Sequence, residues 1–277
     1  MNSVFYIRIN PVAFRLGSLN ISWYELLLGL AAITVLAWLV WQNHHVRIIS
    51  NRTILIGTLI ALPSGLVFSK MLHVADQPSL YAGHWGNIFS AEGLTIWGGV
   101  LGATLAVWVY SLISRKFRFA PLMDLMAPGI ILGQAVGRVG CTINGCCYGI
   151  PSTSPLAVIY TSTPYAPAGI PVLPVTVFEI VYNLAVFGIL LLLRGRFKKP
   201  GTLFLVYFAL YAAWRFASDF LRGGTAFFQN IHFLTGVPFF SSLHQAQVIA
   251  LIILLITIPL IIRRGGIVSR SPGESSN

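Results

Sequence analysis

The sequence predicts an all-α polytopic membrane protein with about seven transmembrane helices. Of its 277 residues, 56% are hydrophobic and only 9% are charged, whereas a soluble globular domain carries about 25% charged residues. The mean hydropathy is +0.79. This composition excludes a disordered chain, a coiled coil and an ordinary water-soluble enzyme.

Seven apolar stretches approach the length of about 20 residues that one crossing of a bilayer requires. The fourth stretch is short and contains Pro128, which predicts a kinked or tilted helix. We expect one integral membrane domain over 1–268, with long outer loops at about 138–173 and 222–242 and a disordered cytoplasmic tail at 269–277. The seven stretches are 20–42, 54–73, 93–114, 120–137, 174–194, 201–221 and 243–262.

Basic residues gather in alternate loops, which predicts an outside N-terminus and a cytoplasmic C-terminus by the positive-inside rule. This distribution also explains the net charge of +11 as a topological signal, so we expect no nucleic-acid partner. The basic loops contain Arg47 and Arg52; Arg115, Lys116 and Arg118; Arg194, Arg196, Lys198 and Lys199; and Arg263 and Arg264.

Several charged residues fall inside or beside the predicted helices, where each charge costs roughly 3 kcal/mol to insert. Arg215, Asp219 and Arg222 share one helix face by their i, i+4, i+7 spacing. They could form a structural ladder of salt bridges or a fork that holds phosphate. Arg138 opens the fourth loop at a similar outer depth. Three arginines that converge at this depth suggest a site for an anionic lipid headgroup. The acidic residues of the predicted helices are Glu25, Asp124, Glu179 and Asp219.

Glycines are concentrated in two places. Residues 133–149 read GQAVGRVGCTINGCCYG, and because glycine permits unusual backbone angles, we expect a re-entrant or tightly turned segment, in which Asn144 would hydrogen-bond. A simple turn is the alternative. Gly98 and Gly99, with Gly102, open the third predicted helix, where small residues allow close helix packing.

The three cysteines, Cys141, Cys146 and Cys147, do not form a disulfide framework. A zinc site usually needs further ligands at separated spacing, and the sequence offers no matching pair, so we expect neither a metal nor a cofactor. A redox motif of the Cys-x-x-Cys type is absent. A disulfide and a role as small apolar side chains remain open.

These features together resemble the bacterial phosphatidylglycerol:prolipoprotein diacylglyceryl transferases, over most of the chain. The resemblance rests on Trp23-Tyr24, on the glycines of the third predicted helix, on Asp124 and on GRVGCTINGCCYG at 137–149. It also includes PVTVFE at 174–179, the stripe of Arg215-Phe216, Asp219 and Arg222, and Gln247. The chain is identified as a divergent, GCCYG-type member of this family.

The resemblance implies transfer of a diacylglyceryl group from phosphatidylglycerol to the lipobox cysteine of exported prolipoproteins, in the bacterial inner membrane with the active site outside. It implies that Arg138 and Arg215 hold the lipid phosphate and that Tyr24 lines the site. Substrate contacts are implied for Asn144, Gly149, Arg222, Asp219, Gly98, Gly99 and Asp124.

The chain departs from the family pattern at Trp97, Cys141 and Cys146, where relatives usually have His, Asn and Glu. The usual candidate base is therefore missing, and Asp124 or His244 could replace it. Alternatives are a paralogue that uses the same lipid with another acceptor, a non-enzymatic membrane protein that binds anionic lipid, and a thiol oxidoreductase.

Overall fold

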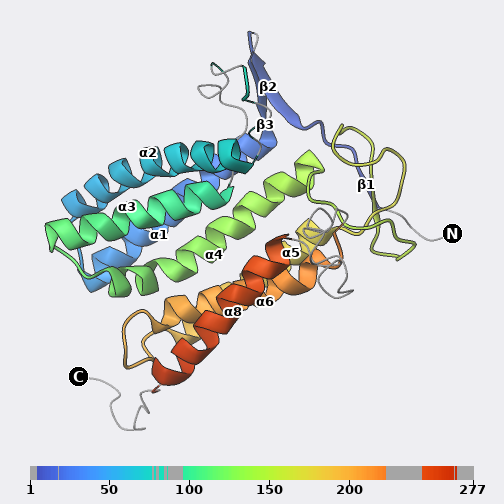
Figure 1. Cartoon of the computed structure of the whole chain (residues 1–277). Coiled ribbons are helices and arrows are strands. Elements are labelled where there is room, and N and C mark those ends of the chain that lie inside the picture. Colours follow the sequence, from blue (N-terminus) through green and yellow to red (C-terminus); the bar gives the residue numbers. More distant parts are fainter. Residues whose placement is uncertain are drawn as a thin grey trace. The chain divides into compact units, whose positions relative to one another are not determined.

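The computed structural model describes residues 5–17, 19–76, 78, 81–83, 86, 96–222, 245–264 and 266. Within these residues the chain is mostly helical, which confirms the predicted all-α membrane class, and four short strands are added (Figure 1). The elements are β1 (Phe5–Ile7), β2 (Val12–Leu16), β3 (Leu19–Ser22), α1 (Trp23–Val46), α2 (Asn51–Asp76), α3 (Ile96–Ser114), α4 (Phe119–Asn144), β4 (Val158–Tyr160), α5 (Val175–Leu193), α6 (Thr202–Asp219) and α8 (Gln245–Arg264).

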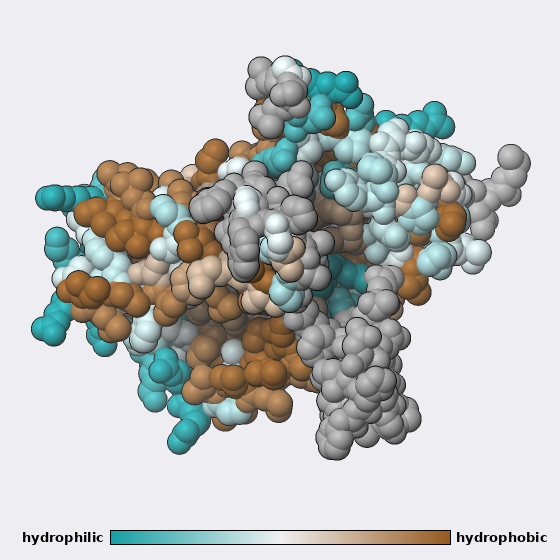
Figure 2. All heavy atoms as spheres, turned by 45° about the horizontal axis from the view of Figure 1, so that its top comes forward, coloured by the Kyte–Doolittle hydropathy of each residue, from teal (hydrophilic) through white to brown (hydrophobic). Residues whose placement is uncertain are grey.

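Each long helix overlaps one of the seven predicted apolar stretches, but α4 continues to Asn144, seven residues beyond the predicted end of the fourth stretch. Among the described residues, α1, α2, α4, α5 and α8 are long and apolar enough to cross a membrane. The apolar part of α3 is shorter, and α6 carries Arg215 and Asp219 near its end. Large apolar side chains lie at the surface and cover wide areas of the face in Figure 2. Ile113, Leu192 and Leu255 are 77%, 69% and 73% exposed, as expected where lipid is the solvent.

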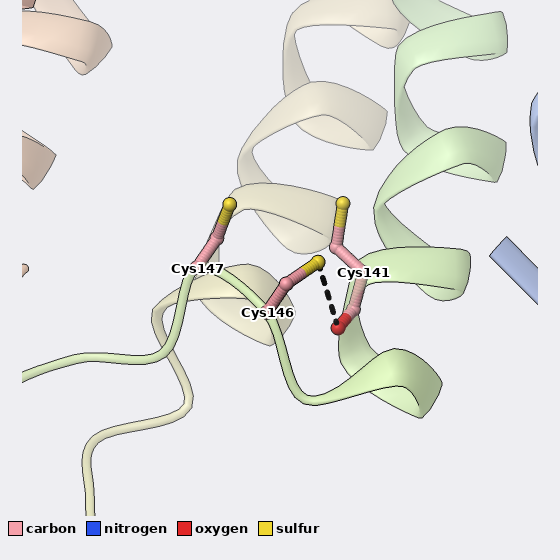
Figure 3. A group of neighbouring side chains, drawn as sticks. All are labelled: Cys141, Cys146 and Cys147. Carbon is pink, nitrogen blue, oxygen red and sulfur yellow. Dashed lines mark hydrogen bonds between the residues drawn. The ribbon is translucent and has the colours of Figure 1, made fainter. Parts of the chain in front are cut away.

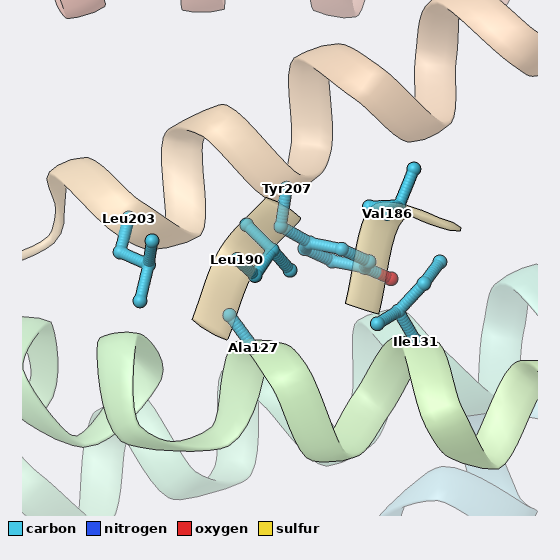
Figure 4. Packing of buried hydrophobic residues seen from close by; sticks show 6 residues of the cluster. All are labelled: Ala127, Ile131, Val186, Leu190, Leu203 and Tyr207. Atoms are coloured by element: carbon cyan, nitrogen blue, oxygen red, sulfur yellow. The ribbon is translucent and has the colours of Figure 1, made fainter. Parts of the chain in front are cut away.

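The chain divides into two compact units, residues 1–39 with 123–277, and residues 40–122. In the first unit, α4, α5 and α6 pack around a buried apolar cluster (Figure 4). The second unit contains the close pair α2 and α3. The cluster in the first unit consists of Ala127, Ile131, Val186, Leu190, Leu203 and Tyr207.

The glycines of α4 allow this helix to approach α1. A Cβ atom at Gly133 would lie 3.0 Å from the carbonyl oxygen of Ala31, and one at Gly140 would lie 3.2 Å from the Cα atom of Tyr24. The expectation of a re-entrant or turned segment is therefore wrong for residues 133–144, which continue α4 without a break. The outer loop starts at Gly145, whose φ of 72° turns the chain.

The long outer loop after α4 contains its own small core. β4 pairs in parallel with β1, and Val158 also bridges to Val172. The antiparallel pair β2–β3 leads directly into α1, whose first turn is closed by a capping box. Its Ser22 N–H donates to Glu25 Oε2 at 2.8 Å, and the Glu25 N–H donates to Ser22 Oγ at 3.3 Å. Most of the predicted loop at 222–242, and the predicted tail at 269–277, lie outside the described residues.

Gly98 provides a test of the packing between α2 and α3. A Cβ atom at Gly98 would lie 2.4 Å from the carbonyl oxygen of Phe68 and 2.6 Å from the Cα atom of Ser69. These are backbone atoms that cannot rotate away. We therefore expect Gly98→Ala to lower the free energy of unfolding by about 1–3 kcal/mol, measured by thermal unfolding in detergent. Gly99→Ala is the control, because its Cβ atom would meet nothing closer than 3.8 Å. Equal unfolding temperatures for the two variants would contradict this packing.

Candidate functional site

The centre of the candidate site is Glu179, in the second turn of α5. Its side chain is 1% exposed. Oε1 accepts a hydrogen bond from Arg138 Nε at 2.8 Å, and Oε2 accepts one from Arg222 Nη2 at 2.9 Å. Arg138 belongs to α4, and Arg222 follows α6. One buried carboxylate therefore links the same end of three helices.

A second ion pair lies on α6, where Arg215 Nη2 donates to Asp219 Oδ1 at 3.0 Å. The three arginines and two carboxylates of both ion-pair groups are largely buried, and together they carry one net positive charge. Arg215 Nη1 and Arg222 Nε are buried without a hydrogen-bond partner among the described residues. An unpaired buried donor costs about 1–3 kcal/mol. We call this set of five side chains the arginine cluster, and its charge and free donors suit one anionic acceptor.

A polar face of α5 places Glu179 in the interior. Thr176, Glu179 and Asn183 are completely or almost completely buried, and their spacing puts them on one side of the helix. The Thr142 hydroxyl of α4 donates to Thr176 Oγ1 at 2.9 Å. In a membrane helix such contacts hold neighbouring helices together without a hydrophobic driving force.

Gly149 brings the outer loop close to the cluster. It forms an antiparallel bridge with Arg222, and its N–H donates to the Leu173 carbonyl at 2.9 Å. A Cβ atom at Gly149 would lie 2.7 Å from Val175 Cγ2 and 2.8 Å from the Leu173 carbonyl oxygen. The absence of a side chain at Gly149 therefore allows the loop to pass between α5 and the end of α6.

Tyr24 and Asn144 border the same end of α4. The Cα atom of Tyr24, in the first turn of α1, faces Gly140 as described above. Asn144 is buried and ends α4, where its carbonyl accepts a hydrogen bond from Thr163 Oγ1 at 2.6 Å. Arg138, Arg215, Arg222 and Asp219 are thus joined in the arginine cluster, and Gly149 contacts it through Arg222.

The three cysteines come together beside the cluster (Figure 3). Cys141 lies in the last turn of α4, and Cys146 and Cys147 lie in the turn that follows. Their Sγ atoms all lie within 4.8 Å of one another, and all three thiols are free. Cys146 Sγ is 3.8 Å from the Cys141 carbonyl oxygen, and Arg138 Nη1 is 3.6 Å from Cys141 Sγ.

The electrostatic environment favours an ionised thiol in this group and a neutral phenol nearby. Hydrogen bonds with Cys141 and Cys146, followed by the positive charges of Arg138 and Arg222, lower the pKa of the Cys147 thiol. Burial raises the pKa of Tyr160 in β4 to about 12, so this phenol stays protonated at neutral pH.

The remaining predicted residues have no described contact with the arginine cluster. Gly98 and Gly99 belong to the second unit, where Gly98 packs against α2. Asp124 lies on α4 about 21 Å along the helix axis from Arg138. Its carboxylate accepts hydrogen bonds from the N–H groups of Gly201 and Phe204, at 2.5 and 2.8 Å, and so stabilises the start of α6. The histidines of the outer segments, His84, His232 and His244, are outside the described residues.

The sequence predicts Glu179 as one of four acids inside the apolar stretches, but it does not identify Glu179 as the centre of the site. The signal was present. Arg138 and Arg222 were basic residues that cytoplasmic topology did not explain, and Glu179 was an acid without a neighbour of opposite charge on its own helix.

Replacement of Glu179 tests the centre of the cluster. We expect Glu179→Gln to lower the free energy of unfolding by about 3–5 kcal/mol, because two buried guanidinium groups lose their common anion. Thermal unfolding in detergent measures this effect. Glu25→Gln is the control, since glutamine also completes a capping box. A loss as small as that of the control would show that Glu179 does not hold the cluster.

Replacement of Asp124 separates helix capping from substrate binding. We expect Asp124→Ala to lower the free energy of unfolding by about 1–2 kcal/mol, because two N–H groups of α6 lose their acceptor. Binding of anionic lipid, measured with vesicles that contain a labelled anionic lipid, should not change. If Asp124→Ala instead abolishes lipid binding and leaves the free energy of unfolding unchanged, Asp124 belongs to the lipid-binding site.

The family of the chain follows from comparison with known proteins. Residues 11–263 match the family model of the prolipoprotein diacylglyceryl transferases. A phosphatidylglycerol–prolipoprotein diacylglyceryl transferase of Dehalococcoides mccartyi is 42% identical, over 94% of this chain and 96% of its own length. One of Clostridium botulinum (strain Loch Maree) is 32% identical, over 80% of this chain and 89% of its own length. The chain is a member of the prolipoprotein diacylglyceryl transferase family.

Proposed function

We propose that this protein transfers the diacylglyceryl group of phosphatidylglycerol to the lipobox cysteine thiol of an exported prolipoprotein and releases glycerol phosphate. The observation that carries the proposal is the arginine cluster. Its single net positive charge matches the single negative charge of a phosphodiester. The free donors of Arg215 and Arg222 offer that phosphate its hydrogen bonds.

The chemistry requires that negative charge leave with the phosphate. The sulfur of the acceptor attacks the glyceryl carbon that carries the phosphate oxygen. A C–S bond forms, the C–O bond breaks, and its electron pair departs with glycerol phosphate. Guanidinium groups fixed in a site of low dielectric constant stabilise this developing charge. Glu179 and Asp219 hold the arginines in place, because both carboxylates are already engaged in ion pairs.

The relatives support the choice of substrates, since their names contain both phosphatidylglycerol and prolipoprotein. We place the protein in the bacterial plasma (inner) membrane as a multi-pass protein. The arginine cluster lies at the ends of α4, α5 and α6 that are remote from the basic loops at 115–118 and 194–199. The positive-inside rule assigns those loops to the cytoplasm, so the site opens on the outer side.

Replacement of Arg215 tests the phosphate contact. We expect Arg215→Ala to lower kcat/KM for transfer by about 100- to 1,000-fold. Arg215→Lys should restore only part of it, because lysine cannot form the bidentate fork. The assay follows labelled phosphatidylglycerol into a lipobox peptide in detergent micelles. Arg196→Ala, at an exposed position, is the control and should retain full activity.

The same assay distinguishes the alternative functions. Consumption of the lipid without lipidation of the peptide indicates a paralogue with another acceptor. Binding of the lipid without any covalent product indicates a non-enzymatic lipid-binding protein. The lipidated peptide, lost in Arg215→Ala and kept in Arg196→Ala, supports the proposed reaction.

A further inference from the structure

Among the residues that the structure describes, one chemical requirement of the proposed reaction has no residue assigned to it. The acceptor thiol must become a thiolate before it attacks, and this normally requires a base. Glu179 is held by two arginines, and Asp219 is held by a third, so both carboxylates are already engaged in ion pairs. The carboxylate of Asp124 already accepts hydrogen bonds from two N–H groups at the start of α6. Within the described part of the chain, the arginine cluster therefore provides charge for the leaving group but no base for the acceptor.

The three thiols have the geometry of a metal site. A zinc ion binds thiolate sulfur at about 2.3 Å, so three sulfurs of a tetrahedral site lie about 3.8 Å apart. The Sγ atoms of Cys141, Cys146 and Cys147 already lie within 4.8 Å of one another. For the three sulfurs to bind one ion, each distance between two Sγ atoms must shorten by no more than about 1 Å. Rotation of the cysteine side chains can supply this movement.

Position and charge also suit a metal with an open coordination site. Cys141 is buried, Cys146 is partly exposed and Cys147 is exposed, so the group extends from the interior to the surface. Three protein ligands and one free position are typical of catalytic zinc, whereas structural zinc has four. Zn²⁺ with three thiolates carries one negative charge, and Arg138 lies 3.6 Å from Cys141 Sγ to offset it.

We propose that Cys141, Cys146 and Cys147 bind one Zn²⁺ ion, and that the lipobox cysteine enters as the fourth ligand and is delivered as a thiolate. The proposal rests on the proposed function. A thiol that coordinates a metal is deprotonated outright, and its proton passes to water. The sulfur then attacks the glyceryl carbon, and the phosphate leaves with the electron pair of the C–O bond. No oxidant or reductant takes part.

Metal content is the first test, and it does not depend on activity. We expect the full-length protein, purified in detergent without chelator, to contain about one zinc ion per chain. Cys146→Ser and the triple variant with all three cysteines replaced by serine should lose it. Ser162→Ala, an exposed change in the same outer loop, is the control. Zinc-free wild-type protein, copper in place of zinc, or a disulfide between two of the thiols would overturn the proposal.

Cobalt substitution tests the fourth position. With Co²⁺ in place of zinc, three sulfur ligands give a sulfur-to-cobalt charge-transfer band. A lipobox peptide with its cysteine should raise this band by about one third, because a fourth sulfur joins the three proposed ones. The same peptide with serine should leave it unchanged. If the cysteine peptide leaves the intensity of this band unchanged, delivery of the acceptor by the metal is overturned.

Chelation separates failure of the zinc proposal from failure of the proposed function. We expect transfer of the diacylglyceryl group to be lost after zinc removal and restored by Zn²⁺, with thermal unfolding used to verify that the zinc-free protein is folded. Full transfer by the folded, zinc-free protein overturns the zinc site and leaves the function intact. Absence of transfer by the zinc-loaded wild type, with a normal cobalt response, overturns the function instead.

Discussion

The carboxylate of Glu179 is the constraint on which the rest of the site depends. It is almost completely buried and accepts hydrogen bonds from one arginine of α4 and from another that follows α6. A buried carboxylate without a positive partner would cost much free energy, and so would either buried arginine without the carboxylate. Each of the two carboxylate oxygens of Glu179 fixes one guanidinium group. These two contacts hold the ends of α4, α5 and α6 next to one another. The ion pair of Arg215 and Asp219 then adds a third guanidinium group to the cluster.

The distribution of polarity in the first unit follows from this constraint. Its interior contains Thr176, Asn183 and Gln247, all fully buried, while large apolar side chains face outward. Lipid solvates those side chains as well as a protein core would, so helices gain little by hiding them. Close approach of backbones replaces the hydrophobic effect, and Gly133 and Gly140 provide it between α4 and α1. Because α4 remains helical as far as Asn144, Cys141 lies on this helix beside the site.

Much of this fold could be predicted from hydropathy and charge, because the bilayer imposes length and polarity on every span. The seven helices and the convergence of Arg138, Arg215 and Arg222 are examples. Three features could not be predicted, since they depend on distances between residues far apart in sequence. Glu179 lies 41 positions after Arg138, Asp124 serves a helix that begins at Thr202, and glycines that suggested a turn serve packing instead. Whether the predicted substrate residues contact lipid stays a prediction.

The thiols show most clearly why sequence spacing is an incomplete guide. Cys141 and Cys146 have a C-x4-C spacing that occurs in zinc sites, but the sequence offers no matching second pair of ligands, so it does not by itself predict a metal. Gly145 and Cys147, with φ angles of 72° and 60°, turn the chain back so that two later sulfurs reach the first. The arginine cluster, with one net positive charge and free donors on Arg215 and Arg222, can stabilise a departing phosphate. The proposed zinc ion, held by soft thiolate ligands next to the cluster, would bind the acceptor sulfur in preference to phosphate. The two halves of a sulfur-alkylation reaction would then have separate sites that meet at Arg138, which contacts both Glu179 and Cys141.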